Sequence, residues 1–135
     1  MNTSAPAGLK FTASHEWVSL SGNTARIGIS DFAVSEIKDI VYADLPAQGK
    51  KVKALEPFGA VETVKAAFDL YAPVSGTVLA SNPELSARPG LISEDPFGAG
   101  WMIEISMDDA SLAEREMAGL MDAEAYAEHC RKQNH

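Results

Sequence analysis

Short runs of alternating hydrophobic and polar residues fill the first three quarters of the chain. Such runs, bounded by Gly, Pro, Asn and Ser, are typical of β-strands joined by tight turns. We expect strands or hairpins over residues 11–17, 18–29, 40–45, 57–64, 68–72, 77–80 and 101–105. The first has a polar break at residues 14–16, and Trp101, Ile103 and Ile105 should share one face of the last.

Helical patterns are few until the end of the chain. Ser30 or Asp31 can cap a short helix that runs to Lys38, and residues 82–90 form a loop or a short helix. Residues 94–100 form a rigid turn. Beyond Asp108 the pattern favours helices over 110–120 and 123–131, capped by Asp109 and Asp122. The expected fold is therefore mainly β, with two small antiparallel sheets, one internal helix and C-terminal helices.

The domain organisation follows from this pattern and from the length of 135 residues. Residues 1–8 form a disordered lead, residues 9–108 a β domain, and residues 109–135 a helical extension packed on the same domain. One cysteine, Cys130, precludes an internal disulfide and fits a reducing, cytosol-like compartment. The N-terminus lacks the layout of a signal or transit peptide, although a mitochondrial protein without its presequence would look similar.

The net charge of −8 narrows the classes of partner. Nucleic acids and anionic membranes attract basic patches, so we expect neither as a partner, and no apolar run reaches membrane-spanning length. An acidic surface favours protein partners with basic docking surfaces, although it also serves solubility alone.

Lys65 is the residue whose setting is most informative. It stands between the strand patterns 57–64 and 68–72, where a hairpin should turn. A catalytic lysine needs burial to lower its pKa, whereas a lysine held out on a tip is accessible to an enzyme that modifies it. The alternative is an ordinary exposed lysine. Glu62, three residues earlier, either helps an attaching enzyme recognise the tip or simply faces solvent.

Other candidate chemistry is weak. We expect His15 to be a structural histidine, and no His, Cys or Asp spacing matches a metal site. Neither a phosphate-binding nor a nucleophile motif is present. The setting of Lys65 on a tip favours a protein that carries a chemical group, so we expect a protein that is not itself an enzyme.

Several motifs in order resemble the glycine cleavage system H proteins. Residues 62–67 (ETVKAA) and 69–76 (DLYAPVSG) resemble the family's lipoyl-lysine segment, and the likeness extends to residues 15–18, 27–33, 39–42, 94–101 and 122–126. The resemblance covers about residues 9–126. It implies a lipoyl-domain-like barrel sandwich hybrid of two sheets, extended by helices.

The same resemblance implies a function. Lys65 would carry lipoic acid, and the arm would take the aminomethyl group of glycine from a pyridoxal-phosphate decarboxylase (P protein) to a tetrahydrofolate-dependent aminomethyltransferase (T protein). A dihydrolipoyl dehydrogenase (L protein) would reoxidise it, and lipoate-attaching enzymes would load it. A surface cleft for the loaded arm would include Ser14, Glu16 and Asp69.

Two departures and several rivals accompany this reading. Phe68 stands where the family usually has a small polar residue, and Leu55 where a glycine is common. The nearest rival is a lipoyl relay protein that donates lipoate to 2-oxoacid dehydrogenase complexes. A biotin carrier and a binding module with an accidental lysine are weaker. We expect a monomer in a bacterial cytoplasm, or in the mitochondrial matrix if a presequence was removed.

Overall fold

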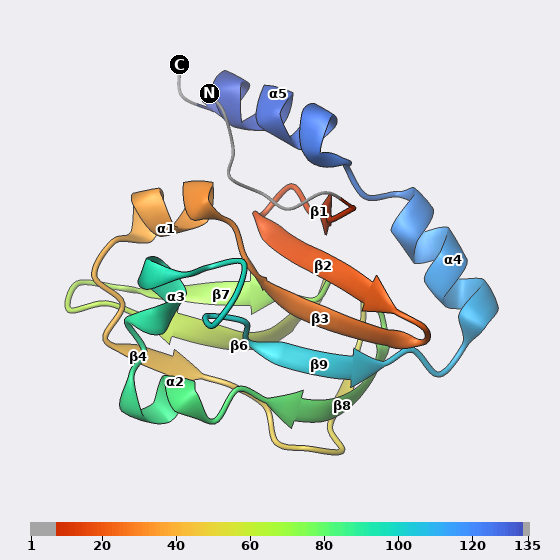
Figure 1. The fold of residues 1–135 in the computed structure, drawn as a ribbon, viewed down its shortest axis with the longest axis horizontal. Helices are drawn as coiled ribbons and strands as arrows, with labels where there is room; N and C mark the ends of the chain where they lie inside the picture. Colours follow the sequence, from red (N-terminus) through yellow and green to blue (C-terminus); the bar gives the residue numbers. More distant parts are fainter. Residues whose placement is uncertain (1–7, 134–135) are drawn as a thin grey trace.

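Two antiparallel sheets form the body of the molecule (Figure 1). The computed structural model describes residues 8–133, so the expected lead over residues 1–8 falls almost wholly outside the described residues. The larger sheet has the order β1 (Lys10–Phe11), β2 (Glu16–Ser21), β3 (Thr24–Ile29), β9 (Ile103–Ser106), β8 (Gly76–Ser81) and β5 (Lys51–Val52). The smaller has the order β4 (Tyr42–Asp44), β6 (Pro57–Glu62) and β7 (Ala67–Tyr71). Within residues 8–133 the sheets do not close into one barrel.

Hydrophobic side chains from both sheets form the main core. Alternation along the strands directs Ile27 of β3, Ile103 and Ile105 of β9, and Val61 and Leu70 of the smaller sheet inward, and all five are almost fully buried. Burial of such side chains is the main force that holds the two sheets together. The expected pair of antiparallel sheets is thereby confirmed.

Five helices within the described residues lie around the sheets. They are α1 (Asp31–Ile37), α2 (Glu84–Ala87), α3 (Leu91–Glu94), α4 (Ala110–Ala118) and α5 (Ala123–Gln133). The predicted caps are confirmed: the side chains of Ser30, Asp109 and Asp122 accept hydrogen bonds from the amides of Ala33, Leu112 and Ala125. The short helix α3 was not expected, because its apolar residues precede a region dominated by turn residues.

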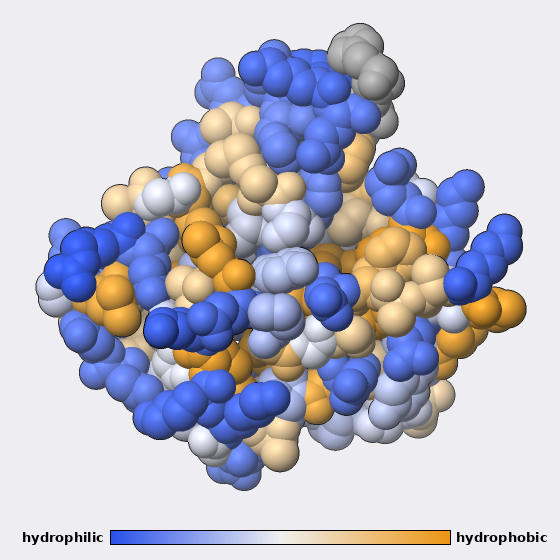
Figure 2. Space-filling view, turned by 180° about the vertical axis from the view of Figure 1, so that it is seen from behind, coloured by the Kyte–Doolittle hydropathy of each residue, from blue (hydrophilic) through white to orange (hydrophobic). Residues whose placement is uncertain are grey.

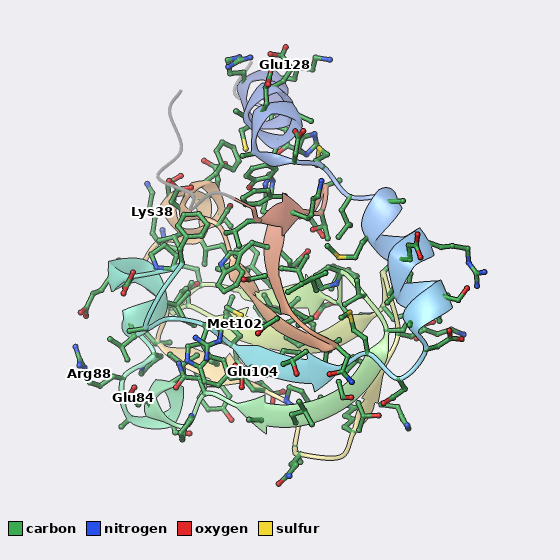
Figure 3. The ribbon with its side chains drawn as sticks, turned by 45° about the vertical axis from the view of Figure 1, so that its right-hand side comes forward. Lys38, Glu84, Arg88, Met102, Glu104 and Glu128 are labelled. Atoms are coloured by element: carbon green, nitrogen blue, oxygen red, sulfur yellow. The ribbon has the colours of Figure 1, made fainter. Side chains whose placement is uncertain are left out.

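The two C-terminal helices pack against different parts of the sheets. Glu116 of α4 accepts bonds from both the amide and the hydroxyl of Ser75, at 2.8 and 2.7 Å, in the turn before β8. Helix α5 lies over β1 (Figure 1) and buries Tyr126 and Cys130 in a second cluster. On its outer side Glu128 points into solvent (Figure 3) and pairs with Arg131. The boundaries of the β domain and the helical extension stay a prediction.

The first predicted strand, over residues 11–17, is wrong as one element. β1 ends at Phe11, the chain reverses, and β2 begins at Glu16, with Phe11 paired to Trp17. The reversal is centred on His15, whose φ of 80° lies in the left-handed region and whose amide donates to the Thr12 carbonyl. The polar break noted in the sequence is therefore a tight turn.

Trp101 does not share a face of β9 with Ile103 and Ile105. The strand begins at Ile103, so Trp101 precedes it and packs against the second cluster under α5. The guanidinium carbon of Arg26 lies 4.7 Å from the centre of its ring, in a cation–π contact.

Candidate functional site

The loop between β6 and β7 is a tight turn at one end of the molecule, beside α1 (Figure 1). Glu62 and Ala67 are the last paired residues, and the amide of Thr63 donates to the Ala66 carbonyl at 2.8 Å. The Thr63 hydroxyl oxygen accepts from the amides of Lys65 and Ala66 at 3.2 and 3.1 Å. Thr63 thus fixes the turn with its own side chain.

Lys65 projects from this turn into solvent. Its neighbours Val64 and Ala66 are exposed as well, Val64 to 88%. Within residues 8–133 no hydrogen bond or ion pair holds the Lys65 ammonium, whereas the backbone beneath it is fixed. A primary amine that is accessible on an ordered support is suited to amide formation with a carboxylic acid.

Sequence reasoning did not identify Thr63 as part of this site. The available signal was a hydroxyl residue two positions before the candidate lysine, which is the spacing of a side-chain-stabilised turn. Glu62 lies at the base of the turn, half-exposed and in register with Tyr42 and Ala67 across the smaller sheet. Its carboxylate is therefore accessible near Lys65.

A hollow of about 450 Å³ opens beside the turn, between it and the end of α1. We call it the tip hollow; it is lined by Glu36, Ile37, Lys38, Asp39, Thr63, Val64, Lys65, Ala66 and Phe68. Lys38 caps the C-terminal end of α1 (Figure 3). Its backbone has φ 65° and ψ −137°, a conformation that residues other than glycine rarely adopt. The chain reverses sharply there, which places the end of α1 against the hairpin.

Ser14 and Glu16 lie together at the turn before β2. Glu16 is 1% exposed, and one of its oxygens accepts from the hydroxyls of Thr12 and Ser14, each at 2.5 Å. The other accepts from the amide of Tyr71 in β7 at 3.0 Å, so this carboxylate links the two sheets. Burial raises the pKa of Glu16, while these hydrogen bonds oppose the rise.

Asp69 lines a different part of the surface from that pair. It lies two residues before Tyr71 on β7, exposed, and lines a separate hollow with Asp44, Pro46 and Lys50. Among the described residues no hydrogen bond or ion pair joins Asp69 to Ser14 or Glu16. The three predicted cleft residues therefore include two neighbours and one carboxylate farther along the adjoining strand.

His15 connects the turn before β2 to α5. Its Nδ1 lies 2.7 Å from the Tyr126 hydroxyl and its Nε2 lies 2.8 Å from Oε1 of Gln133. The Tyr126 hydroxyl is also 2.5 Å from Oγ of Ser30, which caps α1. Burial lowers the pKa of His15 and raises that of Tyr126. These contacts support the structural role expected of His15.

No helix among residues 8–133 is long and apolar enough to cross a bilayer. The same residues contain no group of three or more His, Cys, Asp or Glu side chains arranged to hold a metal ion.

Comparison with known proteins places the chain in a family. The family model for glycine cleavage H-protein matches residues 9–133. The glycine cleavage system H protein of Mycobacterium avium is 49% identical over 122 residues, which are 90% of this chain and 92% of that protein. The Micrococcus luteus protein of the same name is 48% identical over 129 residues, 94% of this chain and 98% of the relative.

A solved structure agrees with these sequences. The crystal structure of a glycine cleavage system H protein from Mycobacterium marinum superimposes with a TM-score of 0.80 at 32% identity. The match covers 91% of this chain and 96% of that one. The chain therefore belongs to the glycine cleavage H-protein family, the non-catalytic lipoyl carriers of the glycine cleavage system.

Proposed function

We propose that Lys65 is the residue that carries lipoic acid, in amide linkage to its Nζ. The observation that supports this most strongly is an exposed lysine, free of side-chain partners among the described residues, at the apex of a turn fixed by Thr63. An attaching enzyme needs the amine accessible and the backbone presented in one shape, and this turn meets both needs.

The lipoyl group supplies a reactive disulfide at the end of a long flexible chain. The protein's own part is to hold the attachment point away from the core and to keep the surrounding surface rigid. A tethered arm raises the effective concentration of its reactive end at any docked enzyme. We propose the P, T and L proteins of the glycine cleavage system as the enzymes visited, and lipoate-attaching enzymes as the source of the arm.

Ser14, Glu16 and Asp69 are proposed as the surface that holds the arm when it bears an amine. Asp69 offers an exposed carboxylate to an ammonium group, and Ser14 offers an exposed hydroxyl. Glu16 is buried, so its proposed part is to orient Ser14 and to fix Tyr71 rather than to meet cargo directly.

Glu62 is proposed as a recognition residue for the attaching enzyme, because its carboxylate is accessible at the base of the turn. Glu62→Gln should lower the rate of lipoylation by purified ligase several-fold, because one charge-assisted contact is lost. Glu56→Gln, at an exposed residue just before the other end of β6, is the matched control. Equal rates for the wild type and Glu62→Gln would remove Glu62 from the recognition surface.

We place the protein in the bacterial cytoplasm, as a monomer that leaves the hairpin tip free. The bacterial relatives support the first point and lend no support to a mitochondrial origin. A lipoyl relay protein, which donates lipoate to 2-oxoacid dehydrogenases, would use the same lysine. Reconstitution with the decarboxylase distinguishes the two functions. A glycine cleavage carrier should support glycine–bicarbonate exchange with the decarboxylase, whereas a relay protein should support little.

Intact mass is the direct test. The full chain from a lipoate-competent cell should gain one lipoyl group, located on Lys65 by peptide mapping. Lys65→Arg should abolish the gain, and Lys53→Arg, an exposed lysine away from the tip, should leave it unchanged. An unmodified Lys65 in a cell that lipoylates its other carriers would refute the proposal.

A further inference from the structure

We propose that Thr12 is a positioning residue for the surface that holds the loaded arm. Its buried hydroxyl orients the Glu16 carboxylate, and Glu16 in turn holds the Ser14 hydroxyl as a hydrogen-bond acceptor for an ammonium group. The inference rests on the proposed function of Ser14 and Glu16 in holding the arm. Thr12 is only 4% exposed, so it acts through these two residues and not by contact with cargo.

Three hydrogen bonds join Thr12 to Glu16 across the turn before β2. The Thr12 hydroxyl donates to Oε1 of Glu16 at 2.5 Å, and its oxygen accepts from the Glu16 amide at 3.1 Å. The Thr12 amide donates to the Glu16 carbonyl at 2.9 Å. One residue therefore fixes both the side chain and the backbone of Glu16, in a buried setting where an unmade hydrogen bond is costly.

The partners of the Glu16 carboxylate determine where the hydroxyl protons point. Oε1 accepts from the hydroxyls of Thr12 and Ser14, and Oε2 accepts from the Tyr71 amide, which can only donate. Burial raises the pKa of Glu16, but these same bonds favour its ionised form. Each hydroxyl has one proton, and donation to a charged oxygen is the strongest bond open to it. Both hydroxyl protons therefore point inward at Oε1.

Ser14 is left with acceptor capacity only. The residue is exposed and its one proton is donated to Glu16, so the remaining lone pairs of its oxygen are free for a donor from solvent. An ammonium N–H can donate to this oxygen, with the negative charge of Glu16 close behind it. An arm whose end carries no donor gains nothing there. The surface should therefore distinguish an arm that bears an amine from the uncharged disulfide form.

The turn that carries this cluster is held from both sides before cargo arrives. On one side His15 is bonded to Tyr126 and Gln133 of α5. Figure 2 shows α5 at the top of the molecule with hydrophilic residues on its outer side, so its buried side faces the turn and β1. On the other side the Tyr71 amide joins Glu16 to β7. A preformed site has a smaller ordering cost on binding than a mobile one.

The stability of the loaded arm in Thr12 variants tests this role. Mass spectrometry first establishes that the full chain carries lipoate and that glycine and the decarboxylase add one aminomethyl group. Water then releases that group as formaldehyde and ammonia and leaves a thiol, and the release of formaldehyde is timed. Thr12→Val keeps the shape but removes the hydroxyl, and it should speed the release about fivefold, the effect of one hydrogen bond. Thr12→Ser retains the hydroxyl and should restore slow release.

The rise in urea midpoint on loading separates positioning from a structural role. A structural defect lowers the midpoints of the oxidised and loaded forms equally, whereas lost positioning reduces the difference between them. An equal difference in Thr12→Val and the wild type would overturn this inference and leave the proposed arm-holding surface in place. No difference in the wild type itself would refute that surface, and this inference with it.

Ser14→Ala tests whether Thr12 acts through Ser14. This variant of an exposed residue should also speed the release of formaldehyde. The double variant, with Thr12→Val added, should release it no faster than Ser14→Ala alone, because the two changes remove one shared interaction. Additive effects would overturn the proposal, since Thr12 would then act by another route. Thr12→Ala provides the same comparisons if the valine variant does not fold.

Discussion

Leu55 is a residue whose side chain and backbone conformation disagree. Its φ is 68°, in the left-handed region, and its side chain is 70% exposed, so burial does not compensate the strain. Its amide donates to the Ala72 carbonyl at 2.7 Å, which fixes that conformation. A glycine would adopt the same φ without a Cβ clash.

Leu55→Gly should therefore stabilise the protein by about 0.5–1 kcal/mol, the relief of strain less the added freedom of the unfolded chain. Urea unfolding should show a higher midpoint with an unchanged slope. Leu20→Gly, also exposed but regularly paired within β2, should instead lower the midpoint. A lower midpoint for Leu55→Gly would mean that the leucine side chain contributes more than its exposure suggests.

Glu16 acts through its burial and its three hydrogen bonds. Glu16→Gln keeps the shape but turns an NH₂ group toward donors, and it should destabilise the protein by about 2 kcal/mol. Because burial raises the pKa of Glu16, its carboxyl favours folding below the ordinary value of 4.5, and that contribution is lost as pH rises through the raised value.

The wild-type advantage over Glu16→Gln should accordingly shrink from about pH 4.5 upward. Urea unfolding of both proteins across this pH range measures the difference in their free energies of unfolding. The contributions of all other titrating groups cancel in this difference. An advantage that grows with pH would show that the hydrogen bonds lower the pKa of Glu16 by more than burial raises it.

The sequence locates Lys65 because local pattern alone places a turn between residues 57–64 and 68–72. It does not place Asp69 relative to Ser14 and Glu16, because that depends on how two strands from different sheets approach each other. Glu16 reaches the edge amide of Tyr71 across the sheets, and no local pattern encodes that contact. Ser14, Glu16 and Asp69 were predicted from the family resemblance, whereas their burial and contacts are known only from the folded structure.

At the scale of elements, the β6–β7 hairpin depends on one hydroxyl. Thr63→Val keeps the side-chain shape but removes the acceptor for the amides of Lys65 and Ala66. Because these amides are exposed, water replaces the bond and global stability should change by less than about 1 kcal/mol. The turn should become less ordered. Hydrogen exchange of the amides at residues 65 and 66 should therefore become faster, and the rate of lipoylation should fall.

Thr63→Ser is the matched control, since it retains the hydroxyl and should keep normal exchange and normal lipoylation. The prediction fails if Thr63→Val is lipoylated at the wild-type rate. It also fails if both variants are impaired equally, which would assign the effect to the lost methyl group.

His15, a titratable residue in the turn before β2, contacts Tyr126 and Gln133 of helix α5. Burial lowers the pKa of His15, so its neutral form favours the folded state, and this stabilisation is lost as pH falls from about 6.5 through the lowered value. The hydrogen bond to Gln133 opposes this lowering of the His15 pKa, the His129 ring, 5.6 Å away between centres, adds to it, and Glu36 opposes it.

Protection of α5 amides against hydrogen exchange, corrected for intrinsic rates, should therefore fall between about pH 7 and pH 5, while that of α4 stays constant. His15→Asn, which tolerates a positive φ, should flatten this dependence. A parallel loss in both helices would indicate global unfolding instead of release of α5.

The elements predicted best are those with local signals. The caps Ser30, Asp109 and Asp122 are read directly from residue type and spacing. The reversal at His15 was missed because histidine is not a common turn residue. Its positive φ is held by Tyr126 and Gln133, more than a hundred residues away in sequence.

At the scale of the whole molecule, charge should control how quickly partners are found. The net charge is −8, and the proposed lipoylation of Lys65 would neutralise one cation and make the protein one unit more negative. Association with a basic docking surface on the decarboxylase should be steered electrostatically, and its rate should fall about tenfold from roughly 0.02 M to 0.2 M salt. Stopped-flow binding with the lipoylated protein measures this directly.

Position should matter as well as total charge, because only carboxylates close to the docked partner are weakly screened. Glu62→Gln, at the base of the tip, should reduce both the rate at low salt and its salt dependence. Glu124→Gln removes the same charge from α5, away from the tip (Figure 1), and should change neither by much. Equal effects of the two variants would mean that net charge alone steers the encounter, and that the partner does not approach the lysine end first.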